Sequence, residues 1–507
     1  MAATRSSPSS FAHEQGSAVA LALAMSEGRL SAERLVRDCL ARIDAIDRHG
    51  PRLYSVIELN PEAIAIAKAL DGERKAGRVR GPLHGLPVLI KDNIATGDRM
   101  STSAGSLALD GVRAPRDAHV VKRLRDAGAV ILAKTNLSEW ANIRSTRSVS
   151  GWSARGGLTR NPYALDRSTS GSSSGTAAAI AASLAPLGVG TETDGSIVSP
   201  SSICGLVGLK PTVGRMSRDG IVPIAHTQDT PGPMTRTVAD AALLYAAMAG
   251  RDGADAATAA APDDATAAVA LPDDALRGAR LGVARAYFTG FDEIDGLIEQ
   301  AIVVLQRAGA EIVDPVDLAT PTYSDAELRV LLYETKADLP KYLAAFAPDA
   351  KVKTLADVIA FNRAQREREM PWFAQELFDK AEAYGGLDSK EYLDSLAECR
   401  KGARDDGLDR VLKANRLDAL IAPTGGPAWL IDPVNGDHSG ASFSSPAAVA
   451  GYPHLTVPVG LVRGLPIGLS FVGPAWSEAR LLALGHAYEQ LTKHRRAPAF
   501  TARTTPA

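Results

Sequence analysis

Apolar positions follow two different spacings along the chain, and the change between them indicates where helices and strands are expected. Residues 17–48 show helical spacing in two segments: Gly28 suits the end of the first, and Ser31 can cap the second. A third helix is predicted over residues 61–77. From residue 87 onward, short apolar runs appear between helical segments, which is typical of strands. These runs cover residues 87–90, 129–133, 184–190 and 205–209, and later 419–422, 455–459 and 467–472.

The alternation of strands and helices predicts the fold class. A helix over residues 120–127 ends at Gly128 and leads directly into the apolar run 130–132, and residues 280–316 repeat a strand, a helix and a strand. Such alternation is typical of a parallel sheet between layers of helices. We therefore predict an α/β protein with a mixed, mostly parallel central sheet that is covered by helices on both faces.

Length and composition favour one large domain. The 507 residues alone would suggest roughly three average domains, but no long Gly/Ser or charged linker divides them. Strands are expected near both ends of the chain, so a helical excursion would interrupt one sheet. The prediction is a single domain over residues 1–507, with N-terminal helices (17–80), a core (81–250), a variable, largely helical excursion (251–416) and strands and a helix that complete the sheet (417–500).

Composition and charge narrow the function classes. With 45% hydrophobic and 22% charged residues, the chain can bury a large core. Its net charge of −2 gives no electrostatic reason to expect nucleic acid or an anionic membrane as partner. No stretch approaches the ~20 apolar residues of a membrane span. The three cysteines are widely spaced and odd in number, which excludes a disulfide framework and favours a reducing, cytoplasmic location.

The N-terminus contains one candidate for a secretory signal. Residues 18–25 are apolar, but Glu14 precedes them and Glu27 and Arg29 follow, a pattern that favours a helix over a signal peptide. The first dozen residues, rich in Ser and Ala, are expected to form a loose arm. Export with a removed signal peptide stays an alternative.

Two serine-bearing loops indicate where the chemistry lies. Residues 170–175 read Ser-Gly-Ser-Ser-Ser-Gly and precede an alanine-rich helix, an apolar strand and a second loop over residues 191–197. This order can bring two hydroxyls and several free backbone N–H groups to one place. Upstream, Lys91 stands where another apolar strand ends. An enzyme that attacks a carbonyl carbon needs a nucleophile, a base and N–H donors of this kind.

The same motifs have other interpretations. Residues 171–175 match G-x-S-x-G with Ser173 at the centre, but a nucleophile elbow follows a buried strand, whereas residues 161–169 are polar and contain a proline. His438 and His454 lie downstream, so the order of a Ser-Asp-His enzyme stays open. The Ser/Gly loop could also be a linker or bind an anion. No Walker A loop, dinucleotide fingerprint or zinc-ligand spacing is present, so we expect neither a cofactor nor a metal.

Taken together, the motifs resemble those of the amidase signature family. The similarity runs over nearly the whole chain and is densest from residue 81 to residue 240. It rests on residues 85–93, 133–137, 170–175, 190–197, 204–212 and 229–234. The resemblance implies the amidase signature fold, with Lys91 as base, Ser172 as a bridging serine preceded by a cis peptide bond, and Ser196 as the nucleophile that forms the acyl-enzyme. The spacing of the two serines agrees with the family motif.

These roles impose physical requirements. A free lysine has a pKa near ~10.4, so Lys91 can act as a base near neutral pH only if its pKa is depressed. Burial beside hydroxyl groups and away from carboxylates would have that effect. Strand alternation points neighbouring side chains to opposite faces, so we expect Asp92 to face away from Lys91. The backbone N–H groups of the second loop are expected to form an oxyanion hole; they belong to Thr193, Asp194, Gly195 and Ser196.

Departures from the commonest family pattern are similar to the bacterial peptide amidase branch. They are Ser174, Asp194 and Val198, together with residues 137–142, 151–157 and 427–429. The branch implies hydrolysis of C-terminal carboxamides of peptides, or of amino-acid amides, with release of ammonia. Trp140, Ser173 and Asp194 are candidate substrate-binding residues, although Ser173 and Ser174 also suit a role in holding the loop.

Three alternatives stay open. The chain could be an acylamidase or esterase of broader specificity, the amidase subunit of a tRNA-dependent amidotransferase, or a non-catalytic binding protein. The expected partner is a small-molecule or short-peptide amide, and the oligomeric state is unknown.

Overall fold

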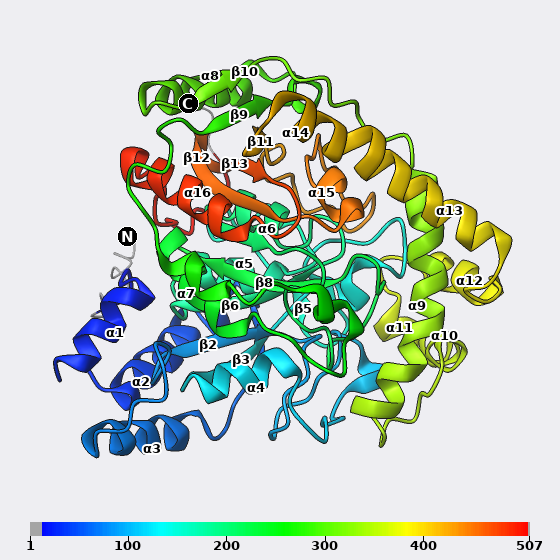
Figure 1. The fold of residues 1–507 in the computed structure, drawn as a ribbon. Coiled ribbons are helices and arrows are strands. Elements are labelled where there is room, and N and C mark those ends of the chain that lie inside the picture. Colours follow the sequence, from blue (N-terminus) through cyan, green and yellow to red (C-terminus); the bar gives the residue numbers. More distant parts are fainter. Residues whose placement is uncertain (1–12, 505–507) are drawn as a thin grey trace, which may run out of the picture.

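An eleven-stranded mixed sheet runs through the middle of the molecule (Figure 1). The computed structural model describes residues 13–504; residues 1–12, which include the expected N-terminal arm, lie outside this range. The strand order is β1-β3-β2-β6-β8-β7-β12-β13-β11-β9-β10. The strands are β1 (Val56–Leu59), β2 (Pro87–Lys91), β3 (Val130–Thr135), β6 (Leu187–Glu192), β7 (Val207–Lys210), β8 (Thr230–Thr235), β9 (Arg280–Val283), β10 (Glu311–Val313), β11 (Ala419–Pro423), β12 (His454–Val462) and β13 (Leu465–Val472), with a separate small hairpin of β4 (Trp152–Ser153) and β5 (Gly157–Leu158).

Parallel and antiparallel pairs occupy different parts of the sheet. Strands β3, β2 and β6 pair in parallel, as do β11, β9 and β10. The strands between these groups pair antiparallel, and so does the edge strand β1. The turn between β12 and β13 consists of Arg463 and Gly464, both with positive φ, which suits a tight hairpin and excludes a parallel crossover there. The α/β class and the mixed sheet are thus confirmed.

Two strands of the main sheet, β8 and β1, were not predicted from the sequence. β8 reads Thr-Pro-Gly-Pro-Met-Thr, yet it is buried along its whole length between β6 and β7. β1 is only half-buried at the sheet edge. Proline and glycine are rare in strand interiors, so propensity argued against β8, and only its position between two other strands makes it one.

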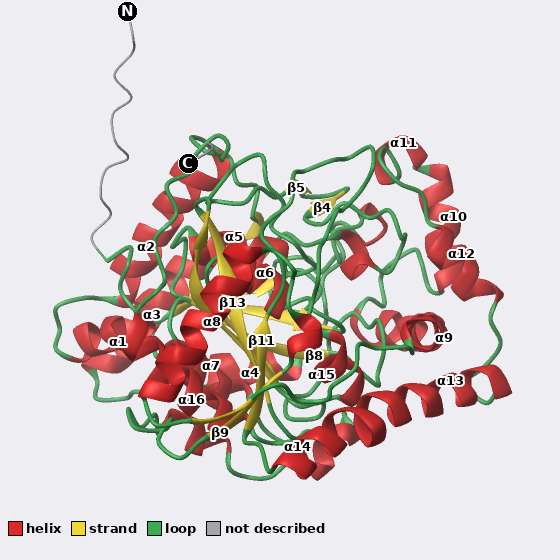
Figure 2. Cartoon of the chain, turned by 90° about the horizontal axis from the view of Figure 1, so that it is seen from above, coloured by secondary structure: helices red, strands yellow, loops and turns green. Residues whose placement is uncertain are grey.

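Helices cover both faces of the sheet, as Figure 2 shows from above. The N-terminal layer is close to the prediction, with Ser31 accepting a hydrogen bond from the N–H of Arg34 at the start of the second helix. The helices are α1 (Ala18–Ser26), α2 (Ala32–Arg42), α3 (Ala63–Lys75), α4 (His119–Asp126), α5 (Ser174–Ala181), α6 (Val198–Ile203), α7 (Val238–Met248), α8 (Asp292–Arg307), α15 (Ser445–Ala450) and α16 (Glu478–Thr492). The buried helix α5 lies directly between the two serine loops.

Within the predicted excursion (251–416), β9 and β10 belong to the main sheet, and the helices of residues 324–415 form one side of the molecule (Figure 1). These helices are α9 (Ser324–Phe346), α10 (Leu355–Ala364), α11 (Arg366–Glu369), α12 (Glu376–Ala383), α13 (Lys390–Arg400) and α14 (Asp409–Asn415). α9 and α13 pack together, and aromatic residues such as Tyr333 and Tyr392 contribute to a hydrophobic cluster that also includes side chains of β11. The excursion is therefore packed against the sheet that carries the serine loops.

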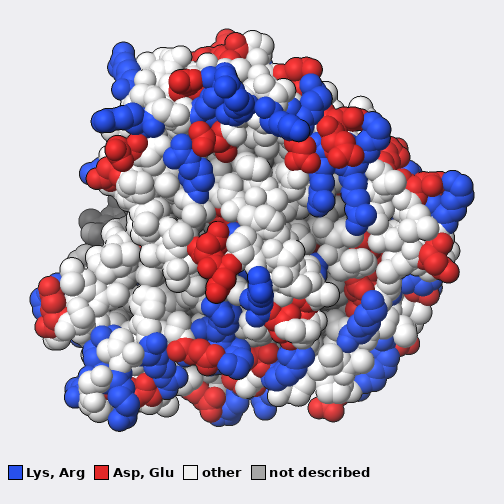
Figure 3. Space-filling model, in the orientation of Figure 1, with Lys and Arg blue, Asp and Glu red and all other residues white. Residues whose placement is uncertain are grey.

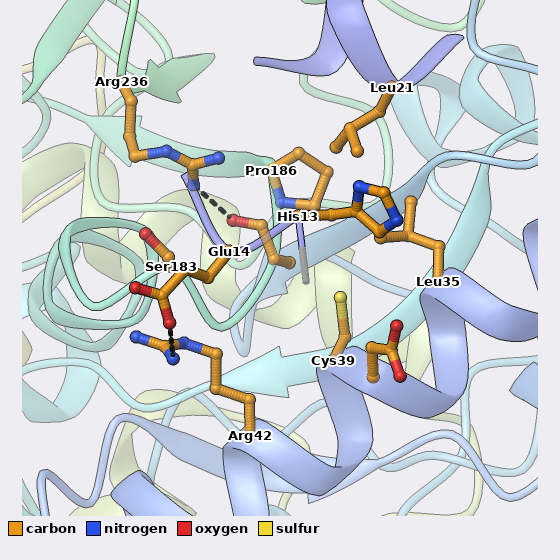
Figure 4. A pocket seen from close by; sticks show the side chains of 11 residues that line it. His13, Glu14, Leu21, Leu35, Cys39, Arg42, Ser183, Pro186 and Arg236 are labelled. Carbon is orange, nitrogen blue, oxygen red and sulfur yellow. Dashed lines mark hydrogen bonds and ion pairs between the residues drawn. The ribbon is translucent and has the colours of Figure 1, made fainter. Parts of the chain in front are cut away.

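Two buried arginines join the N-terminal layer to the core (Figure 4). Arg42 on α2 donates to the carbonyl of Ala182 at 2.9 and 3.0 Å, and Arg236, which follows β8, donates to the carbonyl of Gly16 at 2.7 Å. The thiol of Cys39 lies in the same pocket, and burial raises its pKa to about 12. All three cysteines of the chain are buried and unpaired.

The surface matches the balanced composition. On the face seen in Figure 3, acidic and basic side chains of the described residues are interspersed, and neither sign forms a continuous area. Each helix in residues 13–504 is too short or too polar to cross a lipid bilayer.

Candidate active site

Lys91 is the last residue of β2, and its side chain is completely buried. Its Nζ lies 2.8 Å from Oγ of Ser172, 2.8 Å from Oγ1 of Thr191 and 3.2 Å from the Thr191 carbonyl. Burial lowers the pKa of Lys91 from 10.5 to about 7, although the carboxylates of Asp229 and Glu192 act in the opposite direction. The amine therefore lies among hydroxyls with a pKa suited to a base at neutral pH.

Asp92 and Lys91 point to opposite faces of the sheet, as expected. A carboxylate oxygen of Asp92 accepts from the hydroxyl of Ser103, and Arg155 lies 3.7 Å from the same oxygen. Lys134, on β3, is the nearby lysine that acts on the pKa of Asp92. The neighbour in sequence thus does not hold Lys91 in its charged form.

The Ser/Gly loop reaches the second loop through its backbone. The peptide bond between Gly171 and Ser172 is cis, as the family resemblance implies. Ser172 is buried, its carbonyl accepts from the N–H of Ser138 at 3.1 Å, and the N–H of Ser173 donates to the carbonyl of Ser196 at 3.2 Å. Within residues 13–504, no hydrogen bond joins the hydroxyls of Ser172 and Ser196. The backbone bond nonetheless holds the two loops side by side.

The backbone N–H groups of the second loop fall into two sets. Those of Gly195, Ile197 and Val198 donate to the buried carboxylate of Glu192, at 2.9, 2.7 and 3.0 Å. Those of Thr193, Asp194 and Ser196 have no acceptor among the described residues. The expected four-donor oxyanion hole therefore needs a correction: the N–H of Gly195 is already engaged, and three N–H groups are free.

A second carboxylate holds the loop at Thr193. The Thr193 hydroxyl donates to Asp229 at 2.6 Å, and the other oxygen of Asp229 accepts from two backbone N–H groups, of Ile224 and Ala225. Burial raises the pKa of Asp229 to about 6. Gln228 completes the arrangement by donating to the carbonyl of Thr193 at 3.2 Å.

The three candidate substrate-binding residues lie in different environments. Trp140 has a left-handed backbone with φ 49° and packs edge-on against Phe378, and its indole N–H has no partner among the described residues. Asp194 accepts from the hydroxyl of Ser445 at 2.6 Å, and its carboxylate also faces the buried carboxyl of Glu327, whose pKa it helps to raise. Only Trp140 of the two therefore has a polar atom without a partner among the described residues.

Ser173 serves the loop. Its buried hydroxyl donates to the carbonyl of Thr191 at 3.0 Å and accepts from the Thr191 N–H at 3.2 Å. Both of these bonds tie the Ser/Gly loop to the end of β6, so this hydroxyl is not available to a ligand. The interpretation of Ser173 as a loop-holding residue agrees with the structure better than a role in substrate binding.

Sequence reasoning missed the carboxylates that organise the site. Glu192 and Asp229 both lie inside motifs shared with the family, and that was the only signal available. Nothing in the pattern showed that Glu192 would accept three bonds around Ser196, because those contacts depend on the shape of the turn. Among the described residues, no three His, Cys, Asp or Glu side chains are grouped so that they could hold a metal ion.

Known proteins share this fold. The structure of native peptide amidase from Stenotrophomonas maltophilia superimposes with a TM-score of 0.93 at 51% identity, covering 97% of this chain and 100% of that one. A structure of the peptide amidase PAM in complex with the competitive inhibitor chymostatin also gives 0.93 at 51% identity, covering 96% and 99%. A probable amidase of Arabidopsis thaliana is 39% identical over 97% of this chain and 93% of its own length.

These likenesses, with the fold and the site, define an amide-hydrolysing enzyme. A family model described as amidase matches residues 34–482, and the chain belongs to the amidase signature family.

Proposed function

We propose that the protein is a peptide amidase, which hydrolyses C-terminal carboxamides of peptides, or amino-acid amides, to a carboxylate and ammonia. The observation that carries the catalytic part of this proposal is the buried Nζ of Lys91, 2.8 Å from the Ser172 hydroxyl, with a pKa lowered to about 7. At neutral pH a solvated lysine is almost entirely protonated and cannot accept a proton efficiently, whereas a lysine with a pKa of about 7 can.

The proposed acylation step uses three side chains. Neutral Lys91 accepts the proton of Ser172, Ser172 accepts the proton of Ser196, and Oγ of Ser196 forms a bond to the carbonyl carbon of the amide. For this step the Ser196 hydroxyl turns toward Ser172. The hydrogen bond from the N–H of Ser173 to the carbonyl of Ser196 already holds the two serines side by side. The relay then returns the proton to the amide nitrogen, the C–N bond breaks, and ammonia leaves. Water attacks the acyl-enzyme through the same relay and releases the carboxylic acid.

The negative charge of the tetrahedral intermediate requires donors that are in place before the reaction. We assign this role to the free N–H groups of Thr193, Asp194 and Ser196. Loss of one such donor typically costs about 3–4 kcal/mol of transition-state stabilisation. Since these donors belong to a loop held by buried carboxylates, they need no reorganisation when the charge develops.

The substrate class follows from the branch motifs and the peptide amidase likeness. At 51% identity over nearly the whole chain, the peptide amidase structures support a peptide-like acyl group. We propose that the indole N–H of Trp140, which has no partner among the described residues, binds a polar atom of the substrate, and that the carboxylate of Asp194, beside Ser445 and Glu327, is a second contact. Asp194, as an acceptor, suits N–H groups of a peptide or of its terminal amide.

One assay tests this function against its alternatives. We expect ammonia release from an amidated dipeptide by the isolated protein without ATP, and far slower cleavage of an acylanilide or of an internal peptide bond. Preference for the anilide would reject the peptide amidase assignment and favour a broader acylamidase. Glutamine-dependent activity that needs ATP and partner chains would instead favour the amidotransferase subunit. We also propose a cytoplasmic location, which the buried, unpaired cysteines support.

A further inference from the structure

The turn that carries Ser196 is built around one buried carboxylate. Glu192 is the last residue of β6 and is 1% exposed. One of its oxygens accepts from the N–H of Gly195 at 2.9 Å. The other accepts from the N–H groups of Ile197 at 2.7 Å and Val198 at 3.0 Å. The carboxylate therefore binds the residues on both sides of Ser196 and leaves Ser196 itself between them.

The shape of the turn separates the bound from the free N–H groups. Gly195 has φ +78°, a left-handed conformation that side-chain-bearing residues rarely adopt, and a Cβ there would lie 3.1 Å from Oγ of Ser444. With this reversal, the N–H of Gly195 faces Glu192, whereas that of Ser196 has no acceptor among the described residues. A free N–H next to the nucleophilic oxygen is what an oxyanion hole requires.

We propose that Glu192 is a positioning residue of the amidase site. By binding the N–H groups of Gly195, Ile197 and Val198, it holds the turn so that the N–H groups of Thr193, Asp194 and Ser196 face the substrate. This inference rests on the proposed function of Ser196. Glu192 touches neither the substrate nor the reacting atoms, and it acts only through the backbone it holds.

The charges that face Glu192 come from three elements. Lys210 on β7 is completely buried and lowers the pKa of Glu192, whereas Asp194 in the turn raises it. The third charge is that of Lys91 on β2, whose pKa responds to Glu192. Lys210 in turn faces Glu478 of α16. The Glu192 carboxylate raises the pKa of Lys91, and Asp229 does so as well. Removal of either negative charge should therefore move the ionisation of Lys91 to lower pH.

The deciding variant is Glu192→Gln. An amide has one acceptor oxygen and an NH2 group that only donates, so it cannot serve N–H groups at both ends. At least one of the three backbone bonds is lost and the turn loosens. We expect kcat to fall about 10- to 100-fold, with KM changed less than about threefold, because the oxyanion forms only in the transition state. The acid limb of the kcat/KM profile should shift to lower pH.

Asp229→Asn is the charge-matched control. Its amide oxygen can accept from Ile224 and Ala225 while its NH2 group donates to the Thr193 hydroxyl, so every contact of Asp229 can be kept. The variant removes a negative charge from the surroundings of Lys91, leaves the three bonds of Glu192 around Ser196 unchanged, and can keep a hydrogen bond to Thr193. We expect the acid limb to shift in the same direction, but kcat on the pH plateau to fall much less than in Glu192→Gln.

Two results would overturn the inference: equal plateau kcat values for the two variants, or a loss in Glu192→Gln that appears wholly in KM. Glu192→Asp is the control for a folding defect, because it keeps the negative charge but has a shorter side chain that cannot reach all three backbone N–H groups. This variant should keep the acid limb of the wild-type profile, and its kcat should still be lower than that of the wild type. All assays use whichever amide the wild-type protein hydrolyses. Failure of the peptide amidase assignment would appear in the wild type, whereas failure of this inference appears only in the variants.

Discussion

Two buried lysines on neighbouring strands have different surroundings. Lys91 on β2 and Lys134 on β3 are both fully buried and lie one register position apart, so they face opposite sides of the sheet. Nζ of Lys91 lies among hydroxyls, and its pKa is lowered to about 7. Nζ of Lys134 donates to the carbonyl of Ile94 and the hydroxyl of Thr102, and burial lowers its pKa to about 8 against the opposing carboxylate of Asp92.

The difference between these lysines lies in their partners. The carboxylate that most opposes the lowered pKa of Lys134 is Asp92, which is itself fully buried, so the two charges compensate each other. Both amines have a hydroxyl neighbour, but only that of Lys91, Ser172, belongs to the loop whose backbone is hydrogen-bonded to Ser196. In the proposed mechanism this position, and not burial alone, makes Lys91 the base.

Replacement of the two lysines by methionine should separate the two roles most strongly. Lys91→Met is expected to lower kcat by about 10⁴-fold or more, because the relay loses its proton acceptor. Its thermal stability should be unchanged or higher, since no buried carboxylate depends on Lys91 for a hydrogen bond. Steady-state ammonia release and a thermal melt measure the two effects. A variant that retains activity would remove Lys91 from the mechanism.

Lys134→Met should show the opposite pattern. Loss of Lys134 leaves Arg155, 3.7 Å away, as the remaining cation beside the buried Asp92, and removal of one partner of a buried ion pair typically costs about 3–5 kcal/mol of unfolding free energy. The kcat of the folded fraction should stay within about threefold of the wild type, since Lys134 faces away from the serine loops. Denaturant unfolding with activity measured per folded molecule tests this. A stable but inactive variant would contradict it.

The pH dependence distinguishes the lysines next. Hydrolysis should rise as pH increases through about 7, where Lys91 loses its proton, and the Lys134→Met variant should keep this limb. Stability should also depend on pH, because between about 7 and ~10.4 the unfolded chain binds a proton at residue 91 that the folded chain does not. The folded state thus gains stability with rising pH in this window, and Lys91→Met should lose that contribution. A rate profile that is flat across neutral pH would argue against the lysine base.

The smallest effects are expected from the hydroxyls beside each amine. Thr191→Val removes the hydroxyl 2.8 Å from Nζ of Lys91, and Thr102→Val removes the hydroxyl 2.7 Å from Nζ of Lys134. Each substitution should lower the free energy of unfolding by about 1 kcal/mol. Only Thr191→Val should change kinetics, by moving the acid limb of the rate profile to lower pH, because the charged form of Lys91 loses an acceptor. Equal kinetic behaviour of the two variants would weaken the distinction between the two lysines.

The sequence was most informative where function restricts residue type. The motifs predicted Lys91, Ser172 and Ser196 as the catalytic residues, and the structure brings the amine and the first serine into contact. Apolar runs located most strands, but β8, with two prolines, is a strand only because its neighbours pair with it. The set of free N–H groups in the turn was also beyond sequence reasoning, because it depends on Glu192, which is buried in a geometry that residue patterns do not encode.

The most direct measurement is mass spectrometry of the protein after treatment with a serine-directed phosphonofluoridate. If Ser196 is the nucleophile, the label lies on the peptide that contains Ser196, its rate of attachment rises with pH through about 7 as Lys91 loses its proton, and Lys91→Met stays unlabelled. A label on Ser172 or Ser173, or labelling of Ser196 that is independent of Lys91, would contradict the account.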